Sequence, residues 1–203
     1  MSWSELARLY QLVDWPSVEL VPRYNIAPTQ EVPVIVGEPR HGVLMRWGFP
    51  GAHGLLINAR SETVSKLPAF RESFQARRCL VPADGFYEWK KLGRERHPYL
   101  IELADGRPFS LAGIHDGQQF VVLTTTANPL LEFLHTRMPV ILPPESYSDW
   151  LQERTPENRL QALLTPYPGE ALRTHPVSQR VNHTQNDDAG LLRPVQEQRG
   201  LFD

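Results

Sequence analysis

The chain has 203 residues, of which 41% are hydrophobic, and a formal net charge of −2. This length fills one domain and is short of what two usually need, so we expect a single domain over residues 1–203. No apolar run approaches the roughly 20 residues that cross a bilayer, and the polar start lacks the basic and apolar regions of a signal peptide. We therefore expect a cytoplasmic protein without membrane contact and, by default, a monomer.

Metal and disulfide chemistry has little support in the composition. Cys79 is the one cysteine, which excludes an internal disulfide and a multi-cysteine metal site. Its apolar neighbours predict a buried thiol. The histidines are scattered, with no His-x-x-x-His pair. We expect neither a metal nor a cofactor.

Positive charge gathers in the middle of the chain, where nine basic residues and five acids lie between Asn58 and Leu100. The net charge is too small for a global field that attracts nucleic acid, so any such contact must be local. Arginine outnumbers lysine 18 to 3, and arginine binds phosphate bidentately. Genomic base composition that favours arginine codons explains this ratio equally well.

The predicted elements begin with a short amphipathic helix, because Ser2 and Glu5 form a capping box ahead of a helical stripe at Leu6, Leu9, Tyr10 and Val13. Short apolar runs bounded by Gly, Pro and Asp predict strands at 32–36, 43–47, 55–58, 79–82, 86–90, 99–103, 109–114 and 120–125.

Helices are predicted at 69–75, 128–134, 145–150 and 157–163, the last capped by Thr155 with Pro156 at its first position. Strands and helices do not alternate regularly. The sequence therefore predicts an α+β fold with a curled, mainly antiparallel, barrel-like sheet and short flanking helices. Near the C-terminus, residues 191–195 are apolar enough to dock onto the core, while the tail from 182 to 203 is polar and expected to be partly mobile.

Glu88 is the first candidate for chemistry. It lies in a predicted strand among aromatic residues, which indicates partial burial. A buried carboxylate costs several kcal/mol unless a partner or a proton neutralises it, so such an acid is a candidate catalyst. Residue type alone favours the alternative, an arginine-paired carboxylate with a structural role.

Six blocks in the same order resemble the SOS-response-associated peptidase (SRAP) family: RYNIAPTQ at 23–30, RWG at 46–48, NARSET at 58–63, RCLVPADGFYEW at 78–89, HTRMP at 135–139 and HPVS at 175–178. The resemblance covers nearly the whole chain. It implies an abasic-site processing protein of the DNA-damage response whose partner is single-stranded DNA with abasic sites. In the family, the amine and thiol of an N-terminal cysteine condense with the sugar aldehyde to give a thiazolidine.

The resemblance also implies roles for individual residues. Asn58 would orient the nucleophile, Glu88 would transfer protons as the imine forms, and His135 would act on the ring oxygen of the sugar. Taken alone, His135 is more often an ordinary surface or packing histidine, but its place in the HTRMP block reverses those odds.

The DNA strand would be held by a second group of residues. By the same motifs, Arg60 and Arg137 would bind flanking phosphates. Asn25, Pro28 and Trp89 would belong to the strand-binding groove, where aromatic faces can stack on bases. A buried core position is the alternative for a tryptophan, and for Trp47 it is the better interpretation.

Members of the family begin Met-Cys-Gly-Arg. The chain departs from the family at its start, where Ser2 stands in place of the cysteine and the first strand is absent. Cys79 cannot substitute, because it has no free amine. A start placed downstream of the true first residues is favoured over a paralogue that has lost cross-linking, since Asn58, Glu88 and His135 all remain. The loop at 50–54 also lacks the aromatic residues that many relatives place there.

Three functions therefore stay open. We expect an enzyme of the cross-linking, lyase and self-processing type, with full activity only if an upstream cysteine exists. The alternative is a non-catalytic paralogue that binds single-stranded DNA. A thiol peptidase acting on other proteins is least supported, because Ser2 occupies the position of the thiol.

Overall fold

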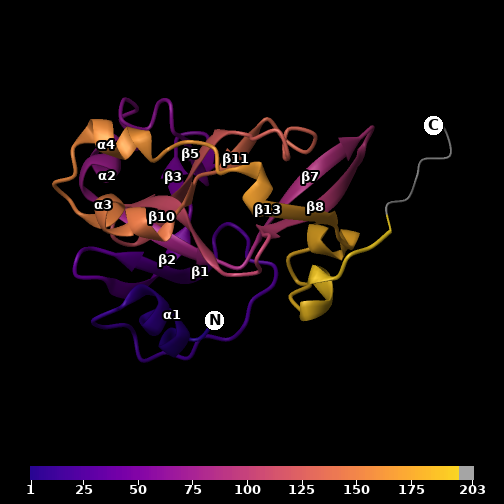
Figure 1. Cartoon of the computed structure of the whole chain (residues 1–203), viewed down its shortest axis with the longest axis horizontal. Coiled ribbons are helices and arrows are strands. Elements are labelled where there is room, and N and C mark those ends of the chain that lie inside the picture. The colour runs from indigo at the N-terminus through magenta and orange to yellow at the C-terminus, as the bar shows by residue number, and fades with distance from the viewer. Residues whose placement is uncertain (197–203) are drawn as a thin grey trace.

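The computed structural model describes residues 1–196, and its centre is a strongly curled sheet (Figure 1). Strands β10, β2, β1, β6 and β9 pair in that order, and β10 also pairs with β9, which closes the ring. Most neighbours are antiparallel; β10 runs parallel to β2 and to β5. The predicted α+β class with a barrel-like sheet is confirmed. The strands of this sheet are β1 (Glu31–Val36), β2 (His41–Trp47), β5 (Asn58–Arg60), β6 (Arg78–Ala83), β9 (Phe109–His115), β10 (Gln119–Thr126), β11 (Arg137–Pro139) and β12 (Ile141–Leu142).

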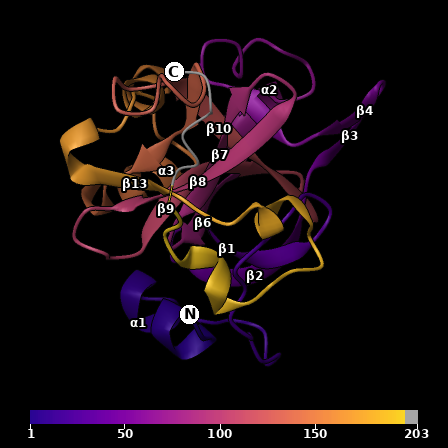
Figure 2. The same ribbon diagram turned by 90° about the vertical axis from the view of Figure 1, so that its right-hand side faces the viewer.

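A second sheet extends from one end of the barrel, and the short helices α2, α3 and α4 gather at the other end (Figures 1 and 2). The strands of the second sheet are β13 (Leu172–Pro176), β8 (Glu95–Leu103) and β7 (Phe86–Leu92). A separate hairpin joins β3 (Phe49–Gly51) to β4 (Gly54–Leu56). The helices are α1 (Trp3–Tyr10), α2 (Arg71–Ala76), α3 (Tyr147–Leu151) and α4 (Glu157–Ala162), with 3-10 turns η1 (Pro144–Ser146), η2 (Gly169–Ala171), η3 (Gln179–Asn182) and η4 (Ala189–Leu192).

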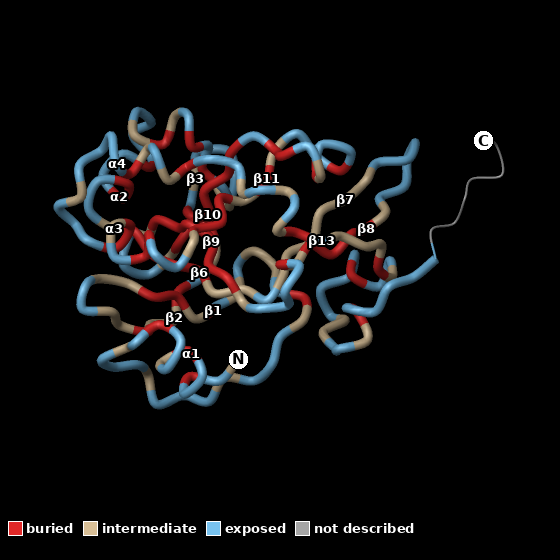
Figure 3. The backbone as a smooth tube through the Cα atoms, viewed as in Figure 1, coloured by how far each residue is buried: buried red, intermediate tan, exposed pale blue. Residues whose placement is uncertain are grey.

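The core has two parts because alternate residues of a strand face opposite sides of the sheet. On β10, Val121 and Leu123 join the helices in one cluster, while Phe120 and Val122 join the other cluster inside the curled sheet. The same alternation separates Leu80 from its neighbour Cys79. Cys79 is fully buried, and burial raises the pKa of its thiol, so the prediction of a core thiol is confirmed. Figure 3 shows this buried centre and the exposed ends of the hairpins.

Arg78 links the sheet to the helical end of the barrel. Its side chain is 2% exposed, and burial lowers the pKa of its guanidinium to about 10. The guanidinium stays charged at neutral pH and lies 5.9 Å from the ring centre of Trp150. Its charge is stabilised by backbone carbonyl oxygens, because it donates hydrogen bonds to those of Phe74, Gln75, Trp150, Gln152 and Glu153.

Several local predictions differ from the structure. Residues 128–134 form turns and no helix, because Asn128 uses its amide group to bond Tyr167 O and its side-chain oxygen to accept from Leu131 N. The predicted strand at 55–58 is two strands separated at Ile57. Pro156 caps α4 in place of Thr155, whose hydroxyl donates instead to Asp149 O.

The ends of the chain agree with expectation in most respects. The capping box of Ser2 and Glu5 is formed, although Leu9 and Val13 are exposed beyond the buried face of α1. Leu191 is fully buried, which confirms docking of the C-terminal segment. The prediction of a partly mobile tail falls in part on residues 197–203, which lie outside the described residues. From residue 1 to 196, every helix is too short or too polar to cross a membrane.

Candidate functional site

The polar residues of the candidate site begin where the inner face of β10 leaves the apolar core. Thr124 continues the face that carries Phe120 and Val122. Strand β5 pairs with β10, so that Asn58 lies opposite Val122 and Arg60 lies opposite Thr124. Ala59, between them, points to the buried side. Asn58 and Arg60 are both exposed on this face, and two residues along a strand are separated by about 7 Å.

Glu88 comes from β7 and extends from the same inner core. Two residues earlier, Phe86 packs edge-on against Phe109 inside the barrel, and Glu88 shares its face of the strand. Glu88 is half-buried. Burial raises the pKa of its carboxyl above the ordinary value, while the nearby charge of His135 and the N–H of Trp89 act in the opposite direction. Within residues 1–196 no lysine or arginine forms an ion pair with Glu88.

His135 is held by the backbone that follows it. Its Nδ1 lies 3.0 Å from the N–H of Arg137 and 3.2 Å from the carbonyl oxygen of the same residue. A neutral ring can accept from the N–H, and a protonated ring can donate to the carbonyl oxygen. Buried Leu131 and Leu134 anchor the loop that carries the exposed imidazole. The ring therefore keeps an Nδ1 partner in both charge states.

The guanidinium group of Arg137 is held by hydrogen bonds to Glu62 and Thr124. Its two terminal nitrogens meet the carboxylate oxygens of Glu62 at 3.0 and 2.9 Å, and its Nε donates to Thr124 Oγ1 at 3.1 Å. One terminal nitrogen also donates to Thr124 O at 2.5 Å. The hydrogen bonds from Arg137 hold the pKa of Glu62 below its ordinary value. Arg137 thus joins β10, β11 and the segment after β5.

Trp89 faces away from Glu88, because neighbours on a strand point to opposite sides. Its indole Nε1 donates to Asn182 Oδ1 at 2.7 Å, which fastens β7 to η3. Trp47, interpreted as a core residue, is half-buried, stacks on Phe120 and donates from Nε1 to Ile57 O at 2.9 Å.

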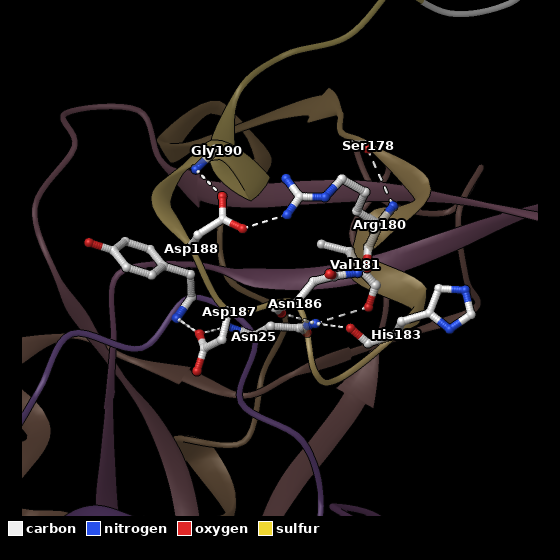
Figure 4. A network of polar contacts seen from close by, with 10 residues as sticks. Asn25, Ser178, Arg180, Val181, His183, Asn186, Asp187, Asp188 and Gly190 are labelled. Atoms are coloured by element: carbon white, nitrogen blue, oxygen red, sulfur yellow. Dashed lines mark hydrogen bonds and ion pairs between the residues drawn. The ribbon is translucent and has the colours of Figure 1, made fainter.

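Asn25 lies inside a polar network that ties the loop before β1 to the C-terminal segment (Figure 4). Its side chain is 5% exposed, and its amide group donates to the carbonyl oxygens of Val181, His183 and Asn186 at 3.0 to 3.2 Å. The carboxylate of Asp187 accepts the N–H groups of Tyr24 and Asn25 and pairs with Arg23. Burial pushes the pKa of Asp187 upward, but these bonds together hold it below its ordinary value.

Pro28 opens the turn that leads from this network to β1. Thr29 has a positive φ of 77°, and its N–H donates to Trp47 O at 2.8 Å. Gln30 closes the turn, since its side-chain oxygen accepts from Ala27 N and from Arg23. Pro28 is half-buried, and its turn lies beside β2 rather than along β7.

The structure therefore brings Glu88 near His135 and connects His135, through Arg137 and Thr124, with Arg60. Asn58 lies on the same strand and face as Arg60. Asn25, Pro28 and Trp89 belong to the neighbouring C-terminal and loop contacts. Sequence reasoning missed Glu62, Thr124 and Asn182 as partners; only Glu62 gave a signal, as the acid of the NARSET block. Among residues 1–196, no three His, Cys, Asp or Glu side chains gather as a metal centre.

Comparison with known proteins shows which family the chain belongs to. The family SOS response associated peptidase (SRAP) matches residues 1–184, and the chain belongs to this family. Abasic site processing protein YoqW of Bacillus subtilis is 36% identical over 197 residues, covering 87% of this chain and 88% of its own length. Abasic site processing protein YedK of Escherichia coli is 32% identical over 192 residues, covering 87% and 86%.

Solved structures share the fold. A protein from Bacteroides thetaiotaomicron superimposes with a TM-score of 0.72 at 24% identity, covering 83% of this chain and 82% of the other. A phage-related protein from Bordetella bronchiseptica superimposes with a TM-score of 0.66 at 31% identity, covering 81% and 87%.

Proposed function

We propose that this chain processes abasic sites in DNA and binds them in single-stranded form. Its family and its relatives named as abasic site processing proteins support the general activity. The observation that carries the proposal is the half-buried Glu88, whose pKa is raised by burial, beside His135. Burial raises the pKa of this carboxyl, and no lysine or arginine in the described part of the chain pairs with it. A carboxyl in this state is suited to proton transfer.

The aldehyde form of an abasic sugar reacts with an amine by losing water. The amine nitrogen attacks the carbonyl carbon, and one of its protons passes to the oxygen to give a carbinolamine. The second nitrogen proton then passes to the same oxygen, the carbon–oxygen bond breaks, and an imine and a water molecule result. Glu88 fits this step because it can accept the proton from nitrogen and return it to oxygen. Asn58, at the exposed edge of β5, would orient the amine.

His135 would act on the sugar ring oxygen when the closed sugar opens. Its Nδ1 has a backbone partner in either charge state, so the ring can gain or lose a proton without turning. Its Nε2, which has no hydrogen bond to residues 1–196, is then the atom that meets the substrate. Arg60 is the exposed cation on this face and would bind a flanking phosphate.

The cross-linking step of the family needs a thiol next to the amine. The thiol adds to the imine carbon, its proton passes to nitrogen, and a five-membered thiazolidine closes with no leaving group. Ser2 here caps α1, and its N–H donates to Glu5 Oε2 at 2.6 Å. We propose that cross-linking requires a cysteine ahead of this cap.

The test uses the chain with and without the family's Met-Cys-Gly-Arg start. Each form is incubated with single-stranded DNA that contains one abasic site, and a denaturing gel separates covalent adducts. We expect an adduct with the extended form, and its loss when Glu88 and His135 are replaced together. An extended, folded protein that gives no adduct contradicts the proposal.

A second candidate function is non-catalytic binding of single-stranded DNA. The helix cap of Ser2 favours it, because the cap uses the residue that aligns with the nucleophile. Its test is the salt dependence of binding to undamaged single strands by the unextended chain, since phosphate contacts make affinity fall as salt rises. Binding that is independent of salt rejects it.

A further inference from the structure

The hairpin of β7 and β8 projects from the barrel (Figure 1). Its sequence carries a concentration of positive charge. Residues 91–96, at its end, are all exposed. They include Lys91, Arg94 and Arg96 and a single acid, Glu95, in a protein whose net charge is −2. The same β7 strand carries Glu88, four residues before the strand ends, and the side chain of Glu88 points to the face opposite to that of Trp89. At about 3.3 Å per residue, the end of the strand lies about 13 Å beyond Glu88.

The pairing of the two strands divides this charge unequally between the faces of the hairpin. Trp89 lies opposite Pro98, and Lys91 lies opposite Arg96. Directly opposed residues share a face, so Trp89, Lys91 and Arg96 form one surface, which we call the basic face. Glu95 is on the other face, where its carboxylate lies 3.0 Å from His97.

The basic face breaks a rule of sheet stability. Like charges directly opposite each other in an antiparallel pair destabilise the pair, and opposite charges stabilise it. An exposed two-stranded hairpin depends on such cross-strand pairs more than a buried strand does. The Lys91 and Arg96 pair therefore weakens the hairpin unless a polyanion neutralises it, and a broken local rule of this kind is typical of a binding site.

We propose that the basic face of the β7–β8 hairpin binds the phosphate backbone of DNA outside the damaged nucleotide. The inference rests on the proposed function and lengthens the contact that it implies. Phosphates supply the regular negative charge that Lys91 and Arg96 lack within the hairpin, and the indole of Trp89 supplies an apolar surface at its base. Arg94, at the turn, extends the same charge outward.

A competing explanation is protection of the sheet edge. Strand β7 is at the edge of its sheet, and lysines on exposed edges prevent pairing with other chains. The variant Lys91→Glu distinguishes the two explanations. It keeps a charge on the edge, so protection is retained. It also turns the like-charged pair into an opposite-charged pair, so the hairpin should become more stable while its attraction for DNA falls.

The experiment measures thermal stability and affinity for undamaged single-stranded oligothymidylate, comparing wild type with K91E. Affinity for single strands changes with log salt by a slope of about 0.7 per phosphate contact, so loss of one contact weakens binding about eightfold at ~50 mM salt and about threefold at ~200 mM. We expect that loss together with an unchanged or higher Tm. The matched control is R154E, an equal charge change at an exposed position between α3 and α4, which should bind as wild type does.

Two results overturn the proposal: K91E that binds with wild-type affinity and salt slope, or R154E that weakens binding as much as K91E does. A lower Tm of K91E overturns the argument from the like-charged pair. Reaction of the cysteine-extended protein with abasic DNA is measured in parallel. Adduct formation with unchanged K91E binding refutes the hairpin contact alone, whereas hairpin-dependent binding without any adduct refutes the abasic-site chemistry alone.

Discussion

Replacing Asn25 by alanine removes the donor that joins the two ends of the polar network in Figure 4. The amide group serves three carbonyl oxygens from a side chain that is 5% exposed. Two N–H groups cannot make three full bonds, so we count two, each worth about 0.5–1.5 kcal/mol net. The buried carbonyl oxygen of Val181, left without its donor, adds about 1–3 kcal/mol. We expect N25A to lower the free energy of unfolding by about 2–6 kcal/mol.

The assay is urea unfolding combined with limited proteolysis of the C-terminal segment. Because the lost bonds hold residues 181–186, cleavage there should accelerate before the barrel unfolds. Asn25→Asp is the matched control for volume: it keeps the side-chain shape, replaces the donor by acceptors, and should cost at least as much at neutral pH. Affinity for single-stranded DNA is measured on the same variants under conditions where they remain folded.

Two outcomes would refute this reasoning. The first is N25A with stability within about 0.5 kcal/mol of wild type, the range of ordinary surface substitutions. The second is N25D as stable as wild type, which would mean that the donors do not matter. A loss of DNA affinity with unchanged stability would instead support the role of Asn25 in the strand-binding groove.

Three further predictions concern buried charge. Glu88→Gln should reduce adduct formation by the cysteine-extended protein about 10²–10⁴-fold, the usual range for a proton-transfer group. Burial raises the pKa of Glu88 above 4.5, so the free energy of unfolding of the wild type falls as pH rises through that raised value. At neutral pH, E88Q should therefore unfold at a higher urea concentration than the wild type, and below pH 4.5 it should have no such advantage. Asp187→Asn should destabilise the protein at neutral pH and make its stability depend less on pH in acid. The reason is that the stabilisation from the lowered pKa of Asp187 is present above pH 3.8 and is lost as pH falls through the lowered value. Equal acid-unfolding profiles of D187N and the wild type would contradict this. Arg78→Lys should cost about 2–4 kcal/mol in urea unfolding, because an ammonium offers fewer donors in a different geometry, and a cost near zero would show that the carbonyl contacts are unimportant.

The strands of the barrel could be predicted because each satisfies a local pattern. Val32 to Val36 and Phe120 to Thr125 are apolar runs bounded by turn residues, and their observed limits differ by one residue at either end where they differ at all. The half-buried state of Glu88 was also predictable, since its aromatic neighbours belong to the sequence around it. The proximity of Glu88 and His135, the proposed proton-transfer residues, could be inferred only from the family motifs, because the two residues are far apart along the chain.

The parts that the sequence did not reveal depend on distant partners. Strand β13 pairs with β8, and Leu172 to Pro176 shows no alternation that would mark it as a strand. Residues 128–134 have apolar spacing typical of a helix, but the hydrogen bond from Asn128 to Tyr167 O draws the segment into turns. Asn25 was interpreted as part of the DNA groove from its motif, and its three carbonyl partners lie more than 150 positions away.

The orientation of Glu88 depends on the turn at the end of the β7–β8 hairpin, because that turn fixes how the two strands align. Glu88 and Trp89 are adjacent but face opposite sides, and only the alignment with β8 decides which side each one takes. A slip of one position would carry the carboxylate to the side of Asn182 and the indole to the side of His135. Gly93, at the end of the hairpin with φ of 61°, sets that alignment. Gly93, a residue without a side chain, therefore helps to determine which residue of β7 occupies the proposed catalytic position.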